Sequence, residues 1–153
     1  MARLDDIPQP TRDAVANAVC PSFETAPFVS GPTLAERRIA IVSSAALIRR
    51  NGTPFLFGSA EVRFLPADAP LNDLLISHVS INFDRSGYQR DINTVYPIER
   101  LRELAAQGIV GSVAATHYTV MGSTDPSTME GAADQISGQL QQERVDAVLL
   151  TPV

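Results

Sequence analysis

The sequence contains little of what several common protein classes require. Its 153 residues include a single cysteine, Cys20, so an internal disulfide framework and a cysteine-rich zinc site are both excluded. The longest apolar run, residues 39–48, is interrupted by two serines and is too short to span a bilayer. The N-terminus lacks the apolar segment of a secretory signal. We therefore expect a cytoplasmic protein without a membrane partner.

Basic residues are also too few for a phosphate-binding face. Twelve of them stand against 17 acidic residues, which gives a net charge of −5 and a pI near 4.9. Nucleic-acid binding needs a basic surface, so we expect no nucleic-acid partner. Apolar residues make up 44% and charged residues 19% of the chain, as in an ordinary soluble globular domain.

The most informative stretch runs from Asp91 to Gly122. Pro97 is placed where the first turn of a helix accepts a residue without an N–H, and Gly108 predicts a left-handed stop. Between them lie apolar residues at helical spacing, namely Ile98, Leu101, Leu104 and Ala105. Residues 109–115 are small and apolar without alternation, which predicts a strand covered on both faces, as in a parallel sheet.

The remaining elements predict the fold class. Residues 1–37 are divided by prolines and indicate an extended N-terminal arm with one short helix at residues 13–19. A second long helix begins at Ser127, which has capping-box spacing with Glu130. Strands are expected at residues 38–48, 60–65, 74–81 and 145–151. We predict a three-layer, Rossmann-like α/β domain over residues 38–153, with a mostly parallel sheet.

The last predicted strand, residues 145–151, is nearly continuous in apolar residues. Such a strand should be central in the sheet and covered by helices on both faces. No helix follows it in the sequence. We therefore expect the α/β domain to be incomplete at its C-terminus, or another chain to cover this strand.

Two histidines, His78 and His117, lie near predicted strand ends, where open α/β sheets bind ligands. They are the candidate catalytic residues. With Asp84 or Asp91 they could ligate a metal, but their long separation leads us to predict no metal site. The candidate substrate-binding residues are Asp91, Asn93, Tyr118, Met121, Gly122 and Thr151.

Each candidate also has a simpler interpretation. Each histidine could be a hydrogen-bonded strand-end residue, Asp91 a loop-bracing carboxylate, and Tyr118 and Met121 packing residues. Cys20 lies beside a proline, with no Lys or His nearby in sequence to lower its pKa, and is interpreted as a buried or inert thiol. Glycine-rich nucleotide motifs and the serine-hydrolase elbow are both absent, so no cofactor is expected.

Four stretches together carry a family resemblance. They are S-H-V-S with the following D-I-N, Y-P-I-E-R-L-R-E-L-A-A-Q-G-I-V-G-S-V-A, H-Y-T-V-M-G and D-A-V-L-L-T-P-V. The region from Arg38 to Val153 resembles the selenoprotein B family of glycine, sarcosine, betaine and D-proline reductases. It is most similar to the short D-proline-reductase-like members.

The resemblance implies a reductase subunit that cleaves a C–N bond of a small amino acid or related amine. In the family, a selenocysteine or cysteine follows the strand that matches residues 145–151, close to a second thiol. The selenolate attacks the carbon next to the amine, and the second thiol resolves the adduct as a selenide–sulfide. This sequence stops at Val153, so we expect selenocysteine just beyond it, encoded by UGA read as stop, or an incomplete chain. The chain alone is then expected to be inactive.

Partners follow from the same resemblance. They would be other reductase subunits or a thiol electron donor, and uncovered apolar surface favours a homo-oligomer. The alternative is a non-catalytic small-molecule-binding or assembly module that ends naturally at Val153. A racemase-like α/β enzyme is a third possibility, but it would need paired catalytic thiols or equivalent bases, which Cys20 alone does not supply.

Overall fold

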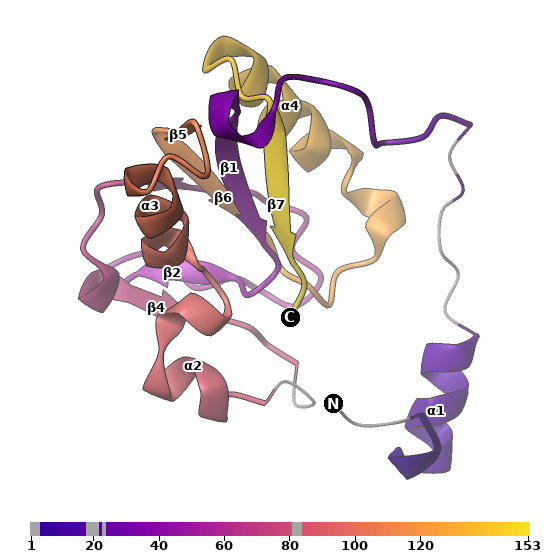
Figure 1. Cartoon of the computed structure of the whole chain (residues 1–153). Coiled ribbons are helices and arrows are strands. Elements are labelled where there is room, and N and C mark those ends of the chain that lie inside the picture. Colours follow the sequence, from indigo (N-terminus) through magenta and orange to yellow (C-terminus); the bar gives the residue numbers. More distant parts are fainter. Residues whose placement is uncertain (1–3, 18–21, 23, 81–83) are drawn as a thin grey trace.

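A computed structural model describes residues 4–17, 22, 24–80 and 84–153 (Figure 1). The helices are α1 (Gln9–Ala16), α2 (Ser86–Arg90), α3 (Ile98–Ala106) and α4 (Glu130–Gln142), with 3₁₀ turns η1 (Leu4–Asp6), η2 (Leu34–Glu36), η3 (Leu71–Asp73), η4 (Ile92–Thr94) and η5 (Pro126–Thr128). The strands are β1 (Arg38–Ser43), β2 (Leu47–Arg49), β3 (Arg63–Pro66), β4 (Leu74–Ile76), β5 (Ser112–Val113), β6 (Thr116–Thr119) and β7 (Ala147–Thr151). Over these ranges, no helix has the length and apolar character needed to cross a membrane.

Strand β1 lies in the middle of a mixed, mostly parallel sheet. Along one edge it pairs in parallel with β5 and then with β6, and along the other it pairs in parallel with β7. Strand β3 adds to the far side of β6 in the antiparallel direction, and β2 and β4 form a separate antiparallel pair. The α/β class and the mostly parallel sheet are therefore confirmed, whereas the three-layer, Rossmann-like arrangement stays a prediction.

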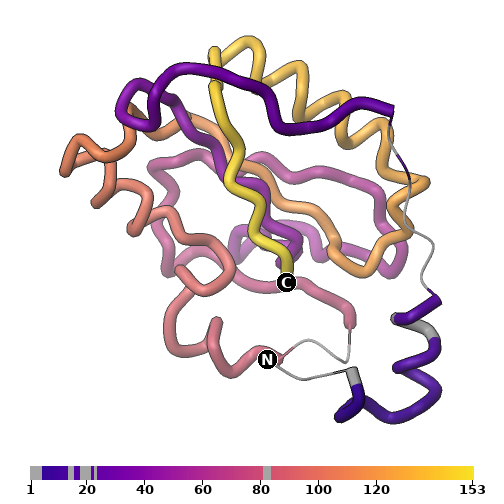
Figure 2. The backbone as a smooth tube through the Cα atoms, turned by 45° about the vertical axis from the view of Figure 1, so that its right-hand side comes forward, coloured from indigo at the N-terminus to yellow at the C-terminus, as the bar shows by residue number. Residues whose placement is uncertain are grey.

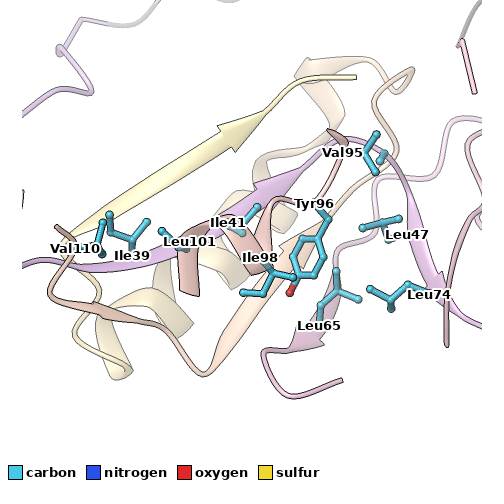
Figure 3. Packing of buried hydrophobic residues seen from close by; sticks show 11 residues of the cluster. Ile39, Ile41, Leu47, Leu65, Leu74, Val95, Tyr96, Ile98, Leu101 and Val110 are labelled. Carbon is cyan, nitrogen blue, oxygen red and sulfur yellow. The ribbon is translucent and has the colours of Figure 1, made fainter. Parts of the chain in front are cut away.

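Helices α3 and α4 pack on side chains that alternate along β1. Ile39 and Ile41 belong to the apolar cluster shown in Figure 3, which includes Ile98 and Leu101 of α3. The residues between them, such as Ala40, pack in a second cluster with α4. Because successive strand side chains point to opposite faces, each helix covers its own face of the sheet.

The helix signals of the central stretch are confirmed. Pro97 caps α3, which begins at Ile98. Ile98 and Leu101 are buried on the expected stripe, whereas Leu104 of the same stripe is 37% exposed. Gly108 adopts a φ of 72°, the left-handed conformation predicted for the helix stop. An L-residue with a side chain would be strained at this φ.

Other boundaries differ from the prediction. The strand expected at residues 38–48 is divided, because Ala46 turns the chain with a φ of 53° between β1 and β2. Helix α1 begins and ends earlier than the predicted residues 13–19, whose last positions lie outside the described residues, as does Cys20. The prediction of a capping box at Ser127 was wrong, because α4 begins only at Glu130. Instead, the Asp125 carboxylate accepts a hydrogen bond from the Ser127 N–H and caps the turn η5.

The strand predicted at residues 109–115 begins later and is interrupted. The Glu143 carboxylate at the end of α4 accepts hydrogen bonds from the N–H groups of Ala115 and Thr116, at 3.0 and 3.2 Å. At the junction of β5 and β6, these two N–H groups therefore donate to a side chain and not to the backbone of a neighbouring strand. Burial raises the pKa of Glu143, but hydrogen bonds led by Thr116 outweigh it and leave the pKa below its usual value.

Strand β7 does not occupy the central position that its composition predicted. It lies beside β1, as Figures 1 and 2 show, and has no second partner strand within the described chain. Leu149 and Leu150 are 41% and 68% exposed. The prediction of a central strand covered on both faces was wrong for the chain by itself.

The segment before β1 contacts the domain through η2. The N–H of Gly111 donates to the Leu34 carbonyl, and a Cβ at Gly111 would meet the Glu36 carbonyl carbon at 2.5 Å. Residues 24–33 are exposed and contain neither helix nor strand. The arm and the domain boundary at residue 37 stay predictions.

Replacing Glu143 by Gln should destabilise the domain, because the neutral amide oxygen that replaces Oε2 is a weaker acceptor for the two N–H groups. The NH₂ group that replaces Oε1 also cannot accept the hydrogen bond from Gln139. We expect the free energy of unfolding to fall by about 1–3 kcal/mol, as for a charge-assisted hydrogen bond. Urea unfolding followed by circular dichroism measures the change. The control is Glu24→Gln, which lies on the exposed segment before β1 and should change the stability little. Equal losses of unfolding free energy in both variants would contradict a stabilising role for the Glu143 hydrogen bonds.

Candidate functional site

Three parallel strands end together at one edge of the sheet. The register pairs Ser43 of β1 with Thr119 of β6 on one side and with Thr151 of β7 on the other. Because laterally paired residues point to the same face, these three form a hydroxyl row across adjacent strand ends. The carboxyl ends of parallel strands are where α/β proteins bind ligands, so the hydroxyl row is the candidate site.

The members of the hydroxyl row differ in their hydrogen bonding. The Ser43 hydroxyl donates to the Val95 carbonyl at 2.7 Å and accepts from the Ala45 N–H. The Thr119 hydroxyl accepts from the Leu47 N–H at 2.9 Å. The Thr151 Oγ1 is buried without a hydrogen-bond partner among the described residues. Thr151 therefore keeps a hydroxyl that a ligand could use, whereas Ser43 and Thr119 brace the surrounding turns.

The backbone behind the row is packed tightly. The N–H of Gly122 donates to the Ser44 carbonyl, and the Val153 N–H donates to the Ser44 Oγ at 2.8 Å. A Cβ at Gly122 would lie 2.8 Å from the Ser44 oxygen, so no larger residue fits there without a shift. Gly122, a predicted substrate-binding residue, thus allows the segment after β6 to approach the turn after β1. On the α4 side of this edge is a shallow, mostly apolar hollow lined by Val42, Ser44, Val120, Leu150, Thr151 and Pro152.

His117 lies on β6 two residues before Thr119, on the same face, and is fully buried. Its Nδ1 accepts a hydrogen bond from the Ile41 N–H at 2.9 Å, so the neutral ring carries its proton on Nε2. That Nε2 and the Tyr96 hydroxyl are both buried without partners in the described part of the chain. The two rings stand edge to face, with centroids 5.7 Å apart. Burial, helped by Arg102, lowers the pKa of His117 to about 4, so the imidazole is neutral at physiological pH.

Tyr118, the next residue, points to the opposite face. It is fully buried in the α4 cluster and contacts Phe64 edge to face, with centroids 5.5 Å apart. Burial, followed by the charge of Glu143, raises the pKa of Tyr118 to about 12. The alternation of a strand therefore separates His117 from Tyr118, and the sheet does not bring these two predicted site residues together.

His78 follows β4 and is held by its own loop. Its Nδ1 accepts from the Ser80 N–H at 3.2 Å, and its carbonyl accepts from the Arg85 guanidinium at 2.8 Å. Burial and then Arg85 lower the pKa of His78. Met121 is fully buried in a third apolar cluster, with Ala46 and Phe55.

Asp91 and Asn93 form a compact cap before α3. The Asp91 carboxylate accepts from the backbone and side-chain N–H groups of Asn93, both at 2.9 Å. Asn93 in turn bonds to the side chain and the N–H of Glu99. The side-chain bond from Asn93, then its backbone bond, lowers the pKa of Asp91. Nothing within the ranges that the structure describes gathers three His, Cys, Asp or Glu side chains into a possible metal site.

Ser43 and Thr119 were not among the predicted site residues. The signal that could have found them is a hydroxyl residue at the last position of three parallel strands, S at 43, T at 119 and T at 151. Only the lateral register of the sheet shows that the three are neighbours. The catalytic role of His78 and His117 and the substrate-binding role of the other predicted residues stay predictions.

Replacing Gly122 by Ala should disturb the turn–turn contact at the strand ends. The new methyl group meets backbone at Ser44 that cannot rotate away, so we expect a loss of unfolding free energy of about 1–3 kcal/mol. Gly138→Ala is the control, because a Cβ there meets nothing within 4 Å in the interior of α4. That substitution should raise stability by about 0.5–1 kcal/mol. Thermal unfolding of both variants measures the contrast, and a neutral Gly122→Ala would contradict the contact.

Stability should fall as the pH drops from 6.5 towards 4. The pKa of His117 is about 4 in the folded chain and near its ordinary 6.5 when unfolded, so the unfolded chain binds the extra proton in this window. The shift corresponds to at most about 3 kcal/mol. Urea unfolding at pH 7 and pH 4.5 measures the loss, and His117→Gln should reduce the difference between the two pH values. Equal losses in both proteins would show that other groups cause the acid sensitivity.

Comparisons with known proteins give the family context. The family of glycine/sarcosine/betaine reductase selenoprotein B matches residues 21–153. D-proline reductase subunit gamma of Acetoanaerobium sticklandii is 33% identical over 121 residues, which cover 77% of this chain and 49% of that protein. Sarcosine reductase complex component B subunit beta of Peptoclostridium acidaminophilum is 24% identical over 119 residues, 74% of this chain and 27% of the relative.

A third relative, glycine reductase complex component B subunit gamma of Symbiobacterium thermophilum, is 26% identical over 138 residues, 86% of this chain and 32% of the relative. This chain thus spans half or less of the length of each of these relatives. No solved structure matches it significantly. The match over residues 21–153 shows that the chain belongs to the selenoprotein B family of glycine, sarcosine and betaine reductases.

Proposed function

We propose that this chain is part of a selenocysteine- or cysteine-dependent reductase that cleaves a C–N bond of a small amino acid or related amine. The observation that carries the proposal is the family match over residues 21–153. The names of the relatives, all subunits of D-proline, sarcosine or glycine reductases, support the same reaction type and other reductase subunits as partners. A thiol protein would supply the electrons, and the complex would work in the cytoplasm.

The redox residue, in this proposal, comes from polypeptide that this sequence does not include. The reaction needs a selenolate or thiolate and a second thiol, whereas the chain has one cysteine. The selenolate would form a bond to the carbon as the C–N bond breaks and the amine leaves with its electron pair. A thiolate would then attack selenium, release the reduced carbon with a proton, and leave an Se–S bond. Two electrons from the thiol donor would restore both groups.

The strand-end edge would supply one wall of the substrate site. Thr151 supports this role, because its buried Oγ1 is free to bond to a ligand. His117 shares the face of the hydroxyl row and would act as a neutral hydrogen-bond donor through Nε2. His78, Asp91, Asn93, Tyr118, Met121 and Gly122 would contribute to the walls around it.

A non-catalytic binding or assembly module is the second candidate. The observation in its favour is the hollow beside Leu150, whose lining contains no ionisable side chain. Such a hollow could hold an apolar group of a small molecule or of a partner chain without any chemistry. In this case the exposed last strand would serve assembly alone.

The first test is the intact mass of the protein produced from its own gene, in its own host, with selenium supplied. We expect a product that is heavier than 16.4 kDa and contains selenium. A selenium-free product of 16.4 kDa would contradict the selenocysteine proposal for this polypeptide. The purified 153-residue chain should show no reductase turnover with a dithiol and D-proline, sarcosine, betaine or glycine. Turnover by this chain would contradict the proposal that the redox residue lies outside it.

A further inference from the structure

The sheet register places a cation beside the hydroxyl row. Arg63, the first residue of β3, pairs with Thr119 of β6, so its side chain leaves the sheet on the same face as the row. The Thr119 hydroxyl accepts from the Leu47 N–H, so β2 lies over this end of the row. Arg63 is therefore at the strand-end edge, where α/β sheets bind ligands.

A hollow of about 190 Å³ adjoins Arg63, with walls from β2, from the turn after β2 and from β3. Four apolar and two basic residues form most of its lining, namely Leu47, Ile48, Phe64, Leu65, Arg49 and Arg63. Within the part of the chain that the structure describes, no acidic residue lines it. This composition suits a small ligand that has an apolar body and one negative charge.

The Arg63 guanidinium is only half bonded on the edge that binds carboxylates. The N–H groups of Nε and Nη2 project in the same direction, and together they can donate to both oxygens of one carboxylate. The Glu61 Oε2 lies 2.6 Å from Nη2, whereas Nε is buried and has no hydrogen-bond partner among the described residues. A buried donor without an acceptor costs free energy, which a carboxylate that accepts from both groups would recover.

The surroundings of Arg63 favour the exchange of Glu61 for a ligand. The guanidinium carbon lies 5.1 Å from the centroid of the buried Phe55 ring, and this stacking holds the plane of the guanidinium in place. The Glu61 side chain is 62% exposed, and an exposed ion pair contributes little stability, so water can solvate the released carboxylate. The Arg49 Nε already donates to Asp73 at 3.0 Å, which leaves Arg63 as the anchor.

We propose that this hollow binds a small carboxylic acid with an apolar body, whose carboxylate replaces Glu61 on Nε and Nη2 of Arg63. The apolar body would lie against the aliphatic side chains of β2 and β3. An amino acid would bind more weakly, because its ammonium group would meet no acidic residue in the described lining. The inference goes beyond the proposed function, since this binding requires neither the redox residue nor a reducing partner.

A ¹H–¹⁵N NMR titration of the 153-residue chain with cyclopentanecarboxylate, at constant ionic strength, tests the proposal. We expect saturable shift changes centred on residues 47–53 and 63–65, with a dissociation constant in the millimolar range. Cyclopentylmethanol has the same ring without the charge and should cause no saturable change. D-proline should bind more weakly than the plain acid. Absence of saturable binding by cyclopentanecarboxylate would overturn the proposal, and tighter binding of D-proline would overturn the assignment to acids that lack an amine.

Removing Glu61 gives a result that a merely structural ion pair would not. Glu61→Ala frees Nη2 of its competitor and should tighten the binding of cyclopentanecarboxylate by about two- to fivefold. Glu103→Ala is the matched control, because it makes the same change of charge at an exposed ion pair with Arg100 on α3. Its dissociation constant should equal that of the unchanged chain. An unchanged affinity in Glu61→Ala would overturn the proposed exchange.

Variants of Arg63 test the anchor itself. Arg63→Gln should raise the dissociation constant by at least about tenfold, because a charge-assisted, two-oxygen contact is lost. Arg63→Lys should give an intermediate value, since it keeps the charge but not the paired donors. Arg100→Gln, on exposed α3, is the control and should not change the affinity. Circular dichroism checks that each variant is folded, and binding that persists unchanged in folded Arg63→Gln would overturn the proposal.

Discussion

Backbone pairing along both edges of β1 is the interaction on which the rest of the structure depends. Strands β5 and β6 bond to one edge and β7 to the other, so β1 sets the register of every strand that reaches the candidate site. The hydroxyl row exists because this register brings residues 43, 119 and 151 level with one another. The same strand divides the core, since its alternate side chains pack under α3 and under α4. A shift of one residue in β1 would place both sets of side chains on the wrong helix.

Much of the local structure could be predicted from the sequence. Helix α3 was expected from Pro97, an apolar stripe and Gly108, and each signal acts within one or two turns of the chain. The α/β class followed from the order of helices and strands, and the four quoted sequence stretches indicated the family that the match over residues 21–153 then showed. These features depend on neighbours in sequence, or on patterns that survive along a whole domain.

The rest depends on contacts that one-dimensional patterns do not contain. An apolar run such as β7 can have the same composition at the centre of a sheet and at its edge, so its edge position could not be predicted from composition. Asp125 replaced Ser127 as the cap because it is placed to accept the Ser127 N–H in η5. Ser43 and Thr119 are unremarkable in sequence and become candidates only through lateral register. His117 and Tyr118 are adjacent in the chain, yet strand alternation places them in different clusters.

The pairing of β1 with β7 also has a consequence for biosynthesis. The N–H of Arg38 at the start of β1 bonds to the Asp146 carboxylate, a residue 108 positions further along. At ribosomal rates of 5–20 residues per second, β1 emerges roughly ten seconds before its partner strand. For most of that interval neither edge of β1 has a partner strand, because β5 begins only at Ser112 and β7 at Ala147. The strand-end edge that carries the hydroxyl row is therefore complete only after β7 has been made.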